Sequence, residues 1–85
     1  MGKGLATKAT LLTALFAFED LKLSRLEILV SVDNYPSLKV AKKVGAHWEG
    51  VLKKRILLKN KTHDAVISCI LNSDLKDIKL KLNRF

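Results

Sequence analysis

The chain has few of the residues that cross-link or interrupt a fold. In 85 residues there is one cysteine, one proline and four glycines. The single cysteine, Cys69, cannot form an internal disulfide, which is typical of a reducing compartment. Because Cys69 stands among Val66, Ile67, Ile70 and Leu71, we interpret it as a buried structural thiol rather than a nucleophile.

Metal ligands and membrane segments are equally scarce. His47 and His63 lie far apart in the sequence, and the chain has neither a second cysteine nor another histidine that could complete a set of ligands. No metal site is therefore predicted. The longest apolar run, residues 11–18, is too short to cross a bilayer, and Glu19 follows it where a signal peptide would need small residues. Ala6 stands where a myristoylation motif requires serine or threonine. We expect a soluble, cytoplasmic protein with no membrane partner.

Acidic residues are half as frequent as basic ones, 8 against 16, which gives a net charge of +8. Residues 39–61 hold eight of the basic residues and one acid, Glu49. This segment is expected to attract a nucleic acid, a phosphorylated cofactor or an acidic protein, or it is simply a solvated lysine-rich face. Aromatic residues make up only 6%, and Tyr35 and Trp48 are the two plausible stacking partners for bases. Nucleic-acid binding is therefore disfavoured.

The remaining composition, 48% hydrophobic and 28% charged, is that of one small folded domain. Such a chain buries roughly 60% of its unfolded surface. Apolar residues at helical spacing predict an amphipathic helix over residues 6–20. We take the following residues as its apolar face: Leu5, Ala9, Leu12, Leu15 and Phe16.

Clean alternation over residues 25–32 predicts a strand with Leu26, Ile28 and Val30 on one face. A turn then leads into a second helix, with Pro36 in its first turn and Gly45 just after its end. Its inner face is predicted to carry Leu38, Ala41 and Val44, with three lysines pointing outward: Lys39, Lys42 and Lys43.

The second half of the chain is predicted to end in an antiparallel hairpin. Residues 46–51 and 52–59 look like two strand segments, residues 60–62 like a turn and residues 64–71 like a final strand. The tail, with apolar residues at helical spacing, is either a docked or a frayed helix. The order loop, helix, strand, helix, strand, strand indicates an α/β fold, and a parallel crossover would place a further strand before Met1 and make the sheet mixed.

Two glycines directly before the first helix suggest a phosphate site. Gly2 and Gly4 let the backbone turn sharply, and unpaired N–H groups at a helix start attract phosphate. The same pattern also occurs in simple tight turns.

The chain resembles the C-terminal half of the GNAT superfamily of N-acetyltransferases, in particular the ribosomal-protein serine/alanine type. The resemblance covers residues 2–74 and leaves residues 75–85 as a tail. It rests on five stretches in the right order: Gly2-Lys3-Gly4-Leu5-Ala6, residues 25–34, residues 34–45 with Asn34-Tyr35-Pro36-Ser37 and Val40-Ala41-Lys42-Lys43-Val44-Gly45, residues 49–53, and His63-Asp64.

The resemblance implies binding of acetyl-CoA as cosubstrate, with no metal. Backbone N–H groups of the first stretch (Gly2, Lys3, Gly4, Leu5, Ala6) would hold the pyrophosphate, and Asn34 and Ser37 would lie beside the pantetheine arm. An amine, of a protein N-terminus or of a small molecule, would attack the thioester directly.

The resemblance also implies two catalytic residues. Ser37 would protonate the leaving thiolate, because Ala41 stands where many members have a tyrosine; alternatively Ser37 only caps its helix. Glu27 would accept the proton of the amine, or it only pairs with Arg25. Lysines 39, 42 and 43 would meet the 3′-phosphate of CoA or solvent.

Several features depart from the family pattern. Met1 replaces a glutamine or arginine, and Ala46 replaces a phenylalanine, which leaves a packing gap that Trp48 would fill. The strands and helices that precede the glycine stretch in the family are expected to be missing, so the strand over residues 26–32 would expose an edge, which leaves a homodimer open. An inactive CoA-binding remnant and a small basic RNA-binding module are the alternatives to an active enzyme.

Overall fold

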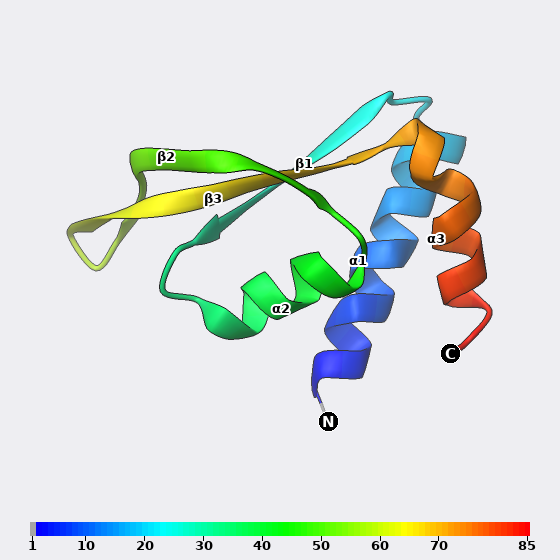
Figure 1. The fold of residues 1–85 in the computed structure, drawn as a ribbon, viewed down its shortest axis with the longest axis horizontal. Coiled ribbons are helices and arrows are strands. Elements are labelled where there is room, and N and C mark those ends of the chain that lie inside the picture. The colour runs from blue at the N-terminus through cyan, green and yellow to red at the C-terminus, as the bar shows by residue number, and fades with distance from the viewer. Residues whose placement is uncertain (1) are drawn as a thin grey trace.

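The structure, a computed structural model, describes the backbone of residues 2–85 and the side chains from Gly4 onward. Its elements along the chain are α1 (Gly2–Glu19), β1 (Arg25–Ser31), α2 (Tyr35–Lys43), β2 (His47–Leu58), β3 (Lys61–Leu71), the short 3₁₀ helix η1 (Asn72–Asp74) and α3 (Leu75–Leu82), as Figure 1 shows.

The three described strands form one antiparallel sheet in the order β1-β3-β2. In its register Leu26 lies opposite Ile70 on one side of β3, and Trp48 lies opposite Ser68 on the other. The predicted α/β class is confirmed. The expectation of a mixed sheet is wrong for the described strands, because the last strand enters between the other two and pairs antiparallel with both.

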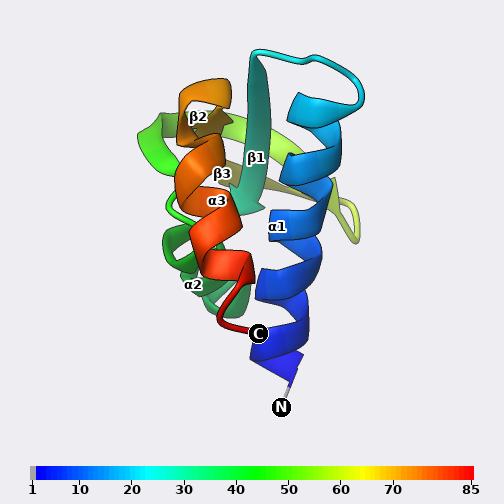
Figure 2. The same cartoon turned by 90° about the vertical axis from the view of Figure 1, so that its right-hand side faces the viewer.

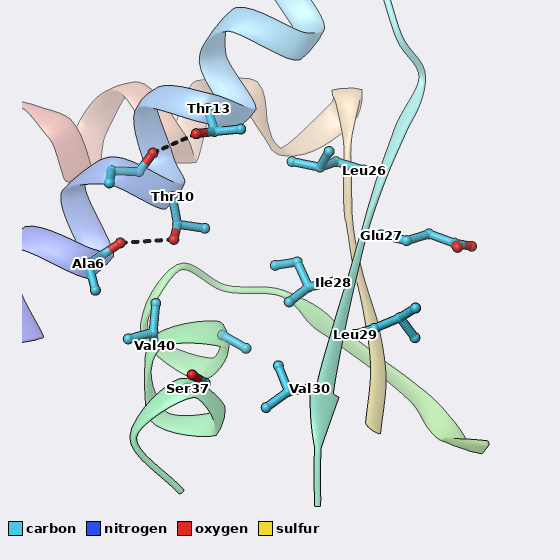
Figure 3. A pocket seen from close by; sticks show the side chains of 12 residues that line it. Ala6, Thr10, Thr13, Leu26, Glu27, Ile28, Leu29, Val30, Ser37 and Val40 are labelled. Carbon is cyan, nitrogen blue, oxygen red and sulfur yellow. Dashed lines mark hydrogen bonds between the residues drawn. The ribbon is translucent and has the colours of Figure 1, made fainter. Parts of the chain in front are cut away.

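β1 and α2 form where the sequence predicts them. Leu26, Ile28 and Val30 point from β1 toward the helices (Figure 3). Asn34 caps α2, with its Oδ1 accepting from the Ser37 N–H at 3.2 Å. Gly45 follows the helix with φ +83°, the left-handed conformation that glycine adopts at little cost. Because residues typical of helix ends stand at both ends of α2, its bounds could be predicted from the sequence.

β2 is one strand rather than the two predicted segments. Its register shifts between Trp48 and Gly50 and again between Leu52 and Ile56, so bulges keep it continuous while bending it. The hairpin turns at Lys59 and Asn60, which both have positive φ (50° and 62°). This is the pattern of a type I′ turn, and it lies one residue before the predicted connection.

The core lies between the three helices and one face of the sheet. Its fully buried members come from every layer: Leu11, Ala14, Phe18, Val44, Ile70 and Ile78. α1 and α3 lie side by side, as the rotated view shows (Figure 2). The tail is therefore a docked helix, with Ile78 only 1% exposed.

The predicted apolar face of α1 is wrong. Leu5, Leu12 and Phe16 are 71%, 47% and 52% exposed, whereas Leu11 and Phe18 are buried. The helix is apolar on nearly all sides between residues 11 and 18, so periodicity alone selects no face, and contact with α3 and α2 decides it. Among the described residues, α1 included, no helix is long and apolar enough to span a membrane.

The predicted glycine loop is also wrong as a backbone conformation. α1 already begins at Gly2. The glycines with positive φ in the described part of the chain are Gly45 and Gly50, so Gly4 has ordinary helical geometry. Leu5, Ala6 and Lys8 favour helix, and they extend it back over the glycines. The first turn still leaves its backbone N–H groups without helical partners.

We expect Ile78→Ala to lower the free energy of unfolding by about 2–5 kcal/mol, because it removes a fully buried side chain from the core. Urea unfolding of the 85-residue chain measures this. Leu80→Ala, on the same helix but exposed, is the matched control and should change stability by less than about 0.5 kcal/mol. Equal effects of the two substitutions would show that the tail is not docked.

Candidate functional site

A groove of about 540 Å³ runs between α1, β1 and α2 (Figure 3). Its lining consists of Ala6, Ala9, Thr10 and Thr13 from α1, residues 26–30 from β1, and Ser37, Val40 and Ala41 from α2. The start of α2 and the first turns of α1 thus border the same space. An elongated ligand could lie in it.

The floor of the groove is the outer backbone edge of β1. The Val32 N–H donates to Asp64 O and the Asn72 N–H donates to Ser24 O, both at 3.0 Å, so the even-numbered residues of β1 bond to β3. In an antiparallel ladder the alternate residues then direct their backbone groups to the other side. Glu27 and Leu29 line the groove although their side chains point away from it (Figure 3). Their peptide groups therefore supply its donors and acceptors.

The walls of the groove are largely apolar. The Thr10 hydroxyl donates to Ala6 O at 2.8 Å and the Thr13 hydroxyl to Ala9 O at 2.9 Å, so both are used within the helix. Nothing in the sequence alone marks these threonines as part of a site. With Leu26, Ile28 and Val40 opposite them, they make a site that suits a flexible, mainly apolar chain bearing a few amides.

Ser37 lies on the groove, on the first turn of α2 (Figure 3). The cap of this helix is Asn34, whose side chain holds the Ser37 backbone N–H. Within residues 2–85 no hydrogen bond engages the Ser37 hydroxyl. The alternative role considered for Ser37, capping by its own hydroxyl, is therefore filled by Asn34, and the hydroxyl is free to meet a ligand.

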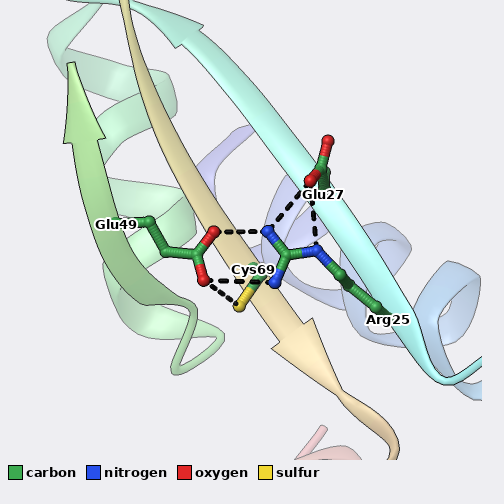
Figure 4. Close-up of polar contacts among 4 residues, drawn as sticks. All are labelled: Arg25, Glu27, Glu49 and Cys69. Atoms are coloured by element: carbon green, nitrogen blue, oxygen red, sulfur yellow. Dashed lines mark hydrogen bonds and ion pairs between the residues drawn. The ribbon is translucent and has the colours of Figure 1, made fainter. Parts of the chain in front are cut away.

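Glu27 is directed to the opposite face of the sheet, so the structure does not bring it together with Ser37. Arg25 Nη2 lies 2.9 Å from Glu27 Oε2 and Arg25 Nη1 lies 3.1 Å from Glu49 Oε2 (Figure 4). The same guanidinium thus joins carboxylates from two strands. Of the two roles considered for Glu27, the structure shows the pairing with Arg25.

This ion network covers the cysteine. Cys69 is buried on β3, and its Sγ donates to Glu49 Oε2 at 3.4 Å. Burial, and then the neighbouring carboxylate, raise the pKa of the Cys69 thiol. The hydrogen bond from Arg25 lowers the pKa of Glu49, and the two glutamates raise the pKa of Arg25. The prediction of a buried structural thiol is consistent with these contacts.

The residues predicted to bind phosphate form the first turn of α1. Ala6 lines the groove, Leu5 points to solvent, and a side chain at Gly4 would meet nothing within 4 Å. The side chain of Lys3 lies outside the described part, but the backbone of Gly2 and Lys3 belongs to the helix. Free N–H groups and the positive end of the helix dipole therefore stand at one end of the groove.

A second groove lies beside Ala46. A space of about 440 Å³ opens between α2 and the sheet, lined by Ala46, Trp48 and Val66 among others. Trp48 is 67% exposed, so it borders the predicted packing gap without filling it. The described residues contain no group of three His, Cys, Asp or Glu side chains placed to hold a metal.

We expect the stabilising effect of Glu49 to disappear in acid. Because Arg25 lowers the pKa of Glu49 in the folded protein, its contribution is present above the ordinary glutamate pKa and is lost as the pH falls through the folded value. Urea unfolding should show wild type more stable than Glu49→Gln at pH 7 and a smaller difference at pH 3. A difference that is the same at both pH values would contradict this.

Comparison with known proteins identifies the fold. Residues 1–47 match the family model described as Acetyltransferase (GNAT) domain. The Bacillus subtilis (strain 168) protein named Probable N-acetyltransferase YjcK is 38% identical over 73 residues, which are 86% of this chain and 40% of the relative. The chain thus spans less than half of that relative.

Solved structures indicate the same family. Mycobacterium smegmatis RimJ in complex with CoA-disulfide is 30% identical with a TM-score of 0.80, over 85% of this chain and 34% of that one. A GNAT-family acetyltransferase from Bacillus anthracis is 34% identical with a TM-score of 0.73, over 84% of this chain and 43% of that one. The resemblance found in the sequence is confirmed, and the chain belongs to the GNAT acetyltransferase family.

Proposed function

We propose that this chain binds acetyl-CoA and takes part in acetyl transfer to an amine, with a protein N-terminus as the favoured acceptor. One observation carries the proposal: the free N–H groups of α1 stand at the end of a groove whose floor is an unpaired backbone edge. The family to which the chain belongs supports it. The relatives are more than twice as long as the matched part, so the proposal concerns the acetyl-CoA side of the reaction.

The groove suits the parts of acetyl-CoA in order. The diphosphate would accept hydrogen bonds from the backbone of residues 2–5, where the helix dipole favours negative charge. The pantetheine arm, an apolar chain with two amides, would lie between α1 and β1 and use the peptide groups of Glu27 and Leu29. The thioester would then reach Ser37, beside Val40 on α2.

The reaction mainly requires that the amine and the thioester be held in the right relative position. A neutral amine attacks the thioester carbonyl, a C–N bond forms, and the C–S bond breaks with release of the CoA thiolate. The Ser37 hydroxyl would give its proton to that thiolate and regain one from solvent or from the attacking nitrogen. A role for Glu27 as proton acceptor stays a prediction, and it requires the side chain to leave Arg25 and turn toward the groove.

We expect acetyl-CoA at a hundred times its Kd to raise the free energy of unfolding by about 2.7 kcal/mol. Gly4→Glu should weaken acetyl-CoA binding roughly tenfold, about 1.4 kcal/mol, because it adds negative charge beside the diphosphate. The same anion suits the helix start, so the free protein should not lose stability. Isothermal titration calorimetry and thermal unfolding measure both quantities.

The matched control is Leu12→Glu, which places the same charge on an exposed position of α1 two turns further along. Binding that is unchanged by Gly4→Glu, or equally weakened by Leu12→Glu, would place the ligand elsewhere. An absence of any acetyl-CoA effect on wild type would contradict the proposed function itself.

Turnover separates an enzyme from a remnant that only binds CoA. We expect Ser37→Ala to lower the rate of CoA release with an amine acceptor by roughly 10²-fold, while acetyl-CoA affinity and stability stay close to wild type because Asn34 supplies the cap. Thiol detection with a chromogenic disulfide follows the rate. Acetyl-CoA binding without measurable turnover in wild type would favour the inactive remnant.

A further inference from the structure

The second groove, beside Ala46, has the properties of a ligand site that the proposed function does not use. Its volume of about 440 Å³ lies within the range typical of small-molecule sites, roughly 300–1,000 Å³. Ala41 borders this groove and also the groove that Ser37 lines, so α2 stands between the two spaces. The other residues that line the second groove are Leu38, Lys42, Ala46, Trp48, Val66 and Ser68.

The floor of the second groove carries a buried hydroxyl without a partner. Ser68 is 6% exposed, and no hydrogen bond among the described residues engages its side chain. It lies opposite Trp48 and opposite Ile28, which points toward the helices (Figure 3), so its own side chain is directed to the helix side as well. The unpartnered side-chain oxygen that is sealed from solvent in the described structure is that of Thr7. The Ser68 oxygen therefore stays open to the groove, as a hydrogen-bonding point for a ligand.

The walls of the second groove suit a flat ring. Trp48 is 67% exposed and borders the space with its indole. Leu38 and Val66 add aliphatic surface, and Ala46 contributes only a methyl group where a larger side chain would close the space. Aromatic pairs in offset or edge-to-face geometry gain more than their buried area alone supplies. An aromatic ligand therefore fits this groove better than an aliphatic one.

The rim of the second groove is positive. Lys42 is exposed at this rim, and Lys39 and Lys43 are exposed on the same helix. None of the three takes part in a salt bridge among the described residues. The carboxylate of β2, that of Glu49, is held by Arg25 (Figure 4). An anionic group at the rim would therefore be stabilised by charges that have no other partner.

The C-terminal end of α2, which also borders the groove, does not cancel this preference. The carbonyl oxygens of residues 40–42 accept from the backbone N–H groups of residues 44–46 at 3.0–3.1 Å, so they are capped. The helix dipole places about half of a negative charge at that end, whereas each of the lysines carries a full positive charge. The net field therefore favours an anion.

We propose that the second groove binds a small phenolic carboxylate. The aromatic ring lies beside Trp48, the carboxylate contacts the Lys42 ammonium at the rim, and the phenolic oxygen hydrogen-bonds to Ser68 at the floor. One exposed and one buried polar group, separated by apolar walls, require a ligand with a polar group at each end of a ring. The site is separate from the proposed acetyl-CoA groove, so it does not rest on the proposed function.

The test uses the fluorescence of the chain itself. Trp48 is the single tryptophan in the sequence, so its emission reports from the site. Titration with 4-hydroxyphenylacetate should change this emission until it saturates, and isothermal titration calorimetry should give the same Kd. Phenylacetate lacks the hydroxyl and 4-hydroxyphenylacetamide lacks the charge. Each should bind roughly fivefold more weakly, as expected for the loss of one hydrogen bond or one exposed ion pair.

Substitutions assign each contact. Lys42→Gln should remove the preference for the carboxylate over the amide. Lys39→Gln, which removes the same charge from an exposed position three residues earlier, is the matched control and should keep that preference. Ser68→Ala should remove the preference for the hydroxylated ring. Ala46→Phe should fill the groove and abolish binding, with thermal unfolding to show that the fold is kept.

The outcomes keep this site distinct from the proposed function. The proposal is overturned if no probe changes the emission in a saturable way, or if either analogue binds as tightly as 4-hydroxyphenylacetate. An equal loss of preference in Lys39→Gln and Lys42→Gln would show an effect of net charge and overturn it too. Mutual exclusion of 4-hydroxyphenylacetate and CoA would place the aromatic acid in the groove of Ser37 instead. Absence of CoA binding, in contrast, contradicts the proposed function and leaves this site intact.

Discussion

The central position of β3 is the constraint on which the rest of the structure depends. β3 pairs with β1 on one side and β2 on the other, and Ile70, near the end of the strand, is fully buried in the core cluster that also holds residues of α1 and α3. A shift of its register by one residue would turn every side chain of the strand to the other face. The same register decides which peptide groups of β1 are used by the sheet. The peptide groups of Glu27 and Leu29 form no hydrogen bond to β3, and they make up the floor of the groove.

The two outer edges of the sheet differ in a way that bears on function. β2 carries two register shifts and a residue with positive φ, Lys54, whose N–H is held by Asp64 at 2.9 Å. Such irregularities and charges discourage a further strand. β1 is regular throughout its seven residues. The edge that remains competent to pair is therefore the one on the proposed cosubstrate groove, and a homodimer through it stays a prediction.

Local signals in the sequence were sufficient for some elements. Alternation determines β1, and the pair Pro36 and Gly45 determines the bounds of α2. Alternation also places Glu27 on the face opposite Leu26 and Ile28, so its separation from Ser37 follows from the strand pattern. What local signals cannot give is strand order, or the contact between Arg25 and Glu49, 24 residues apart. Both depend on β3 entering between strands that precede it.

The first helix is the element whose buried face its own sequence specifies least. Its middle is apolar on most sides, so the buried face is selected by α3, whose own residues lie more than 55 positions later. The glycines at its start suggest a loop because glycine turns freely, but no described contact requires that freedom, and helix propensity extends the helix through them. For phosphate binding the consequence is small, because a helix start supplies the same unpaired donors as a loop that precedes one.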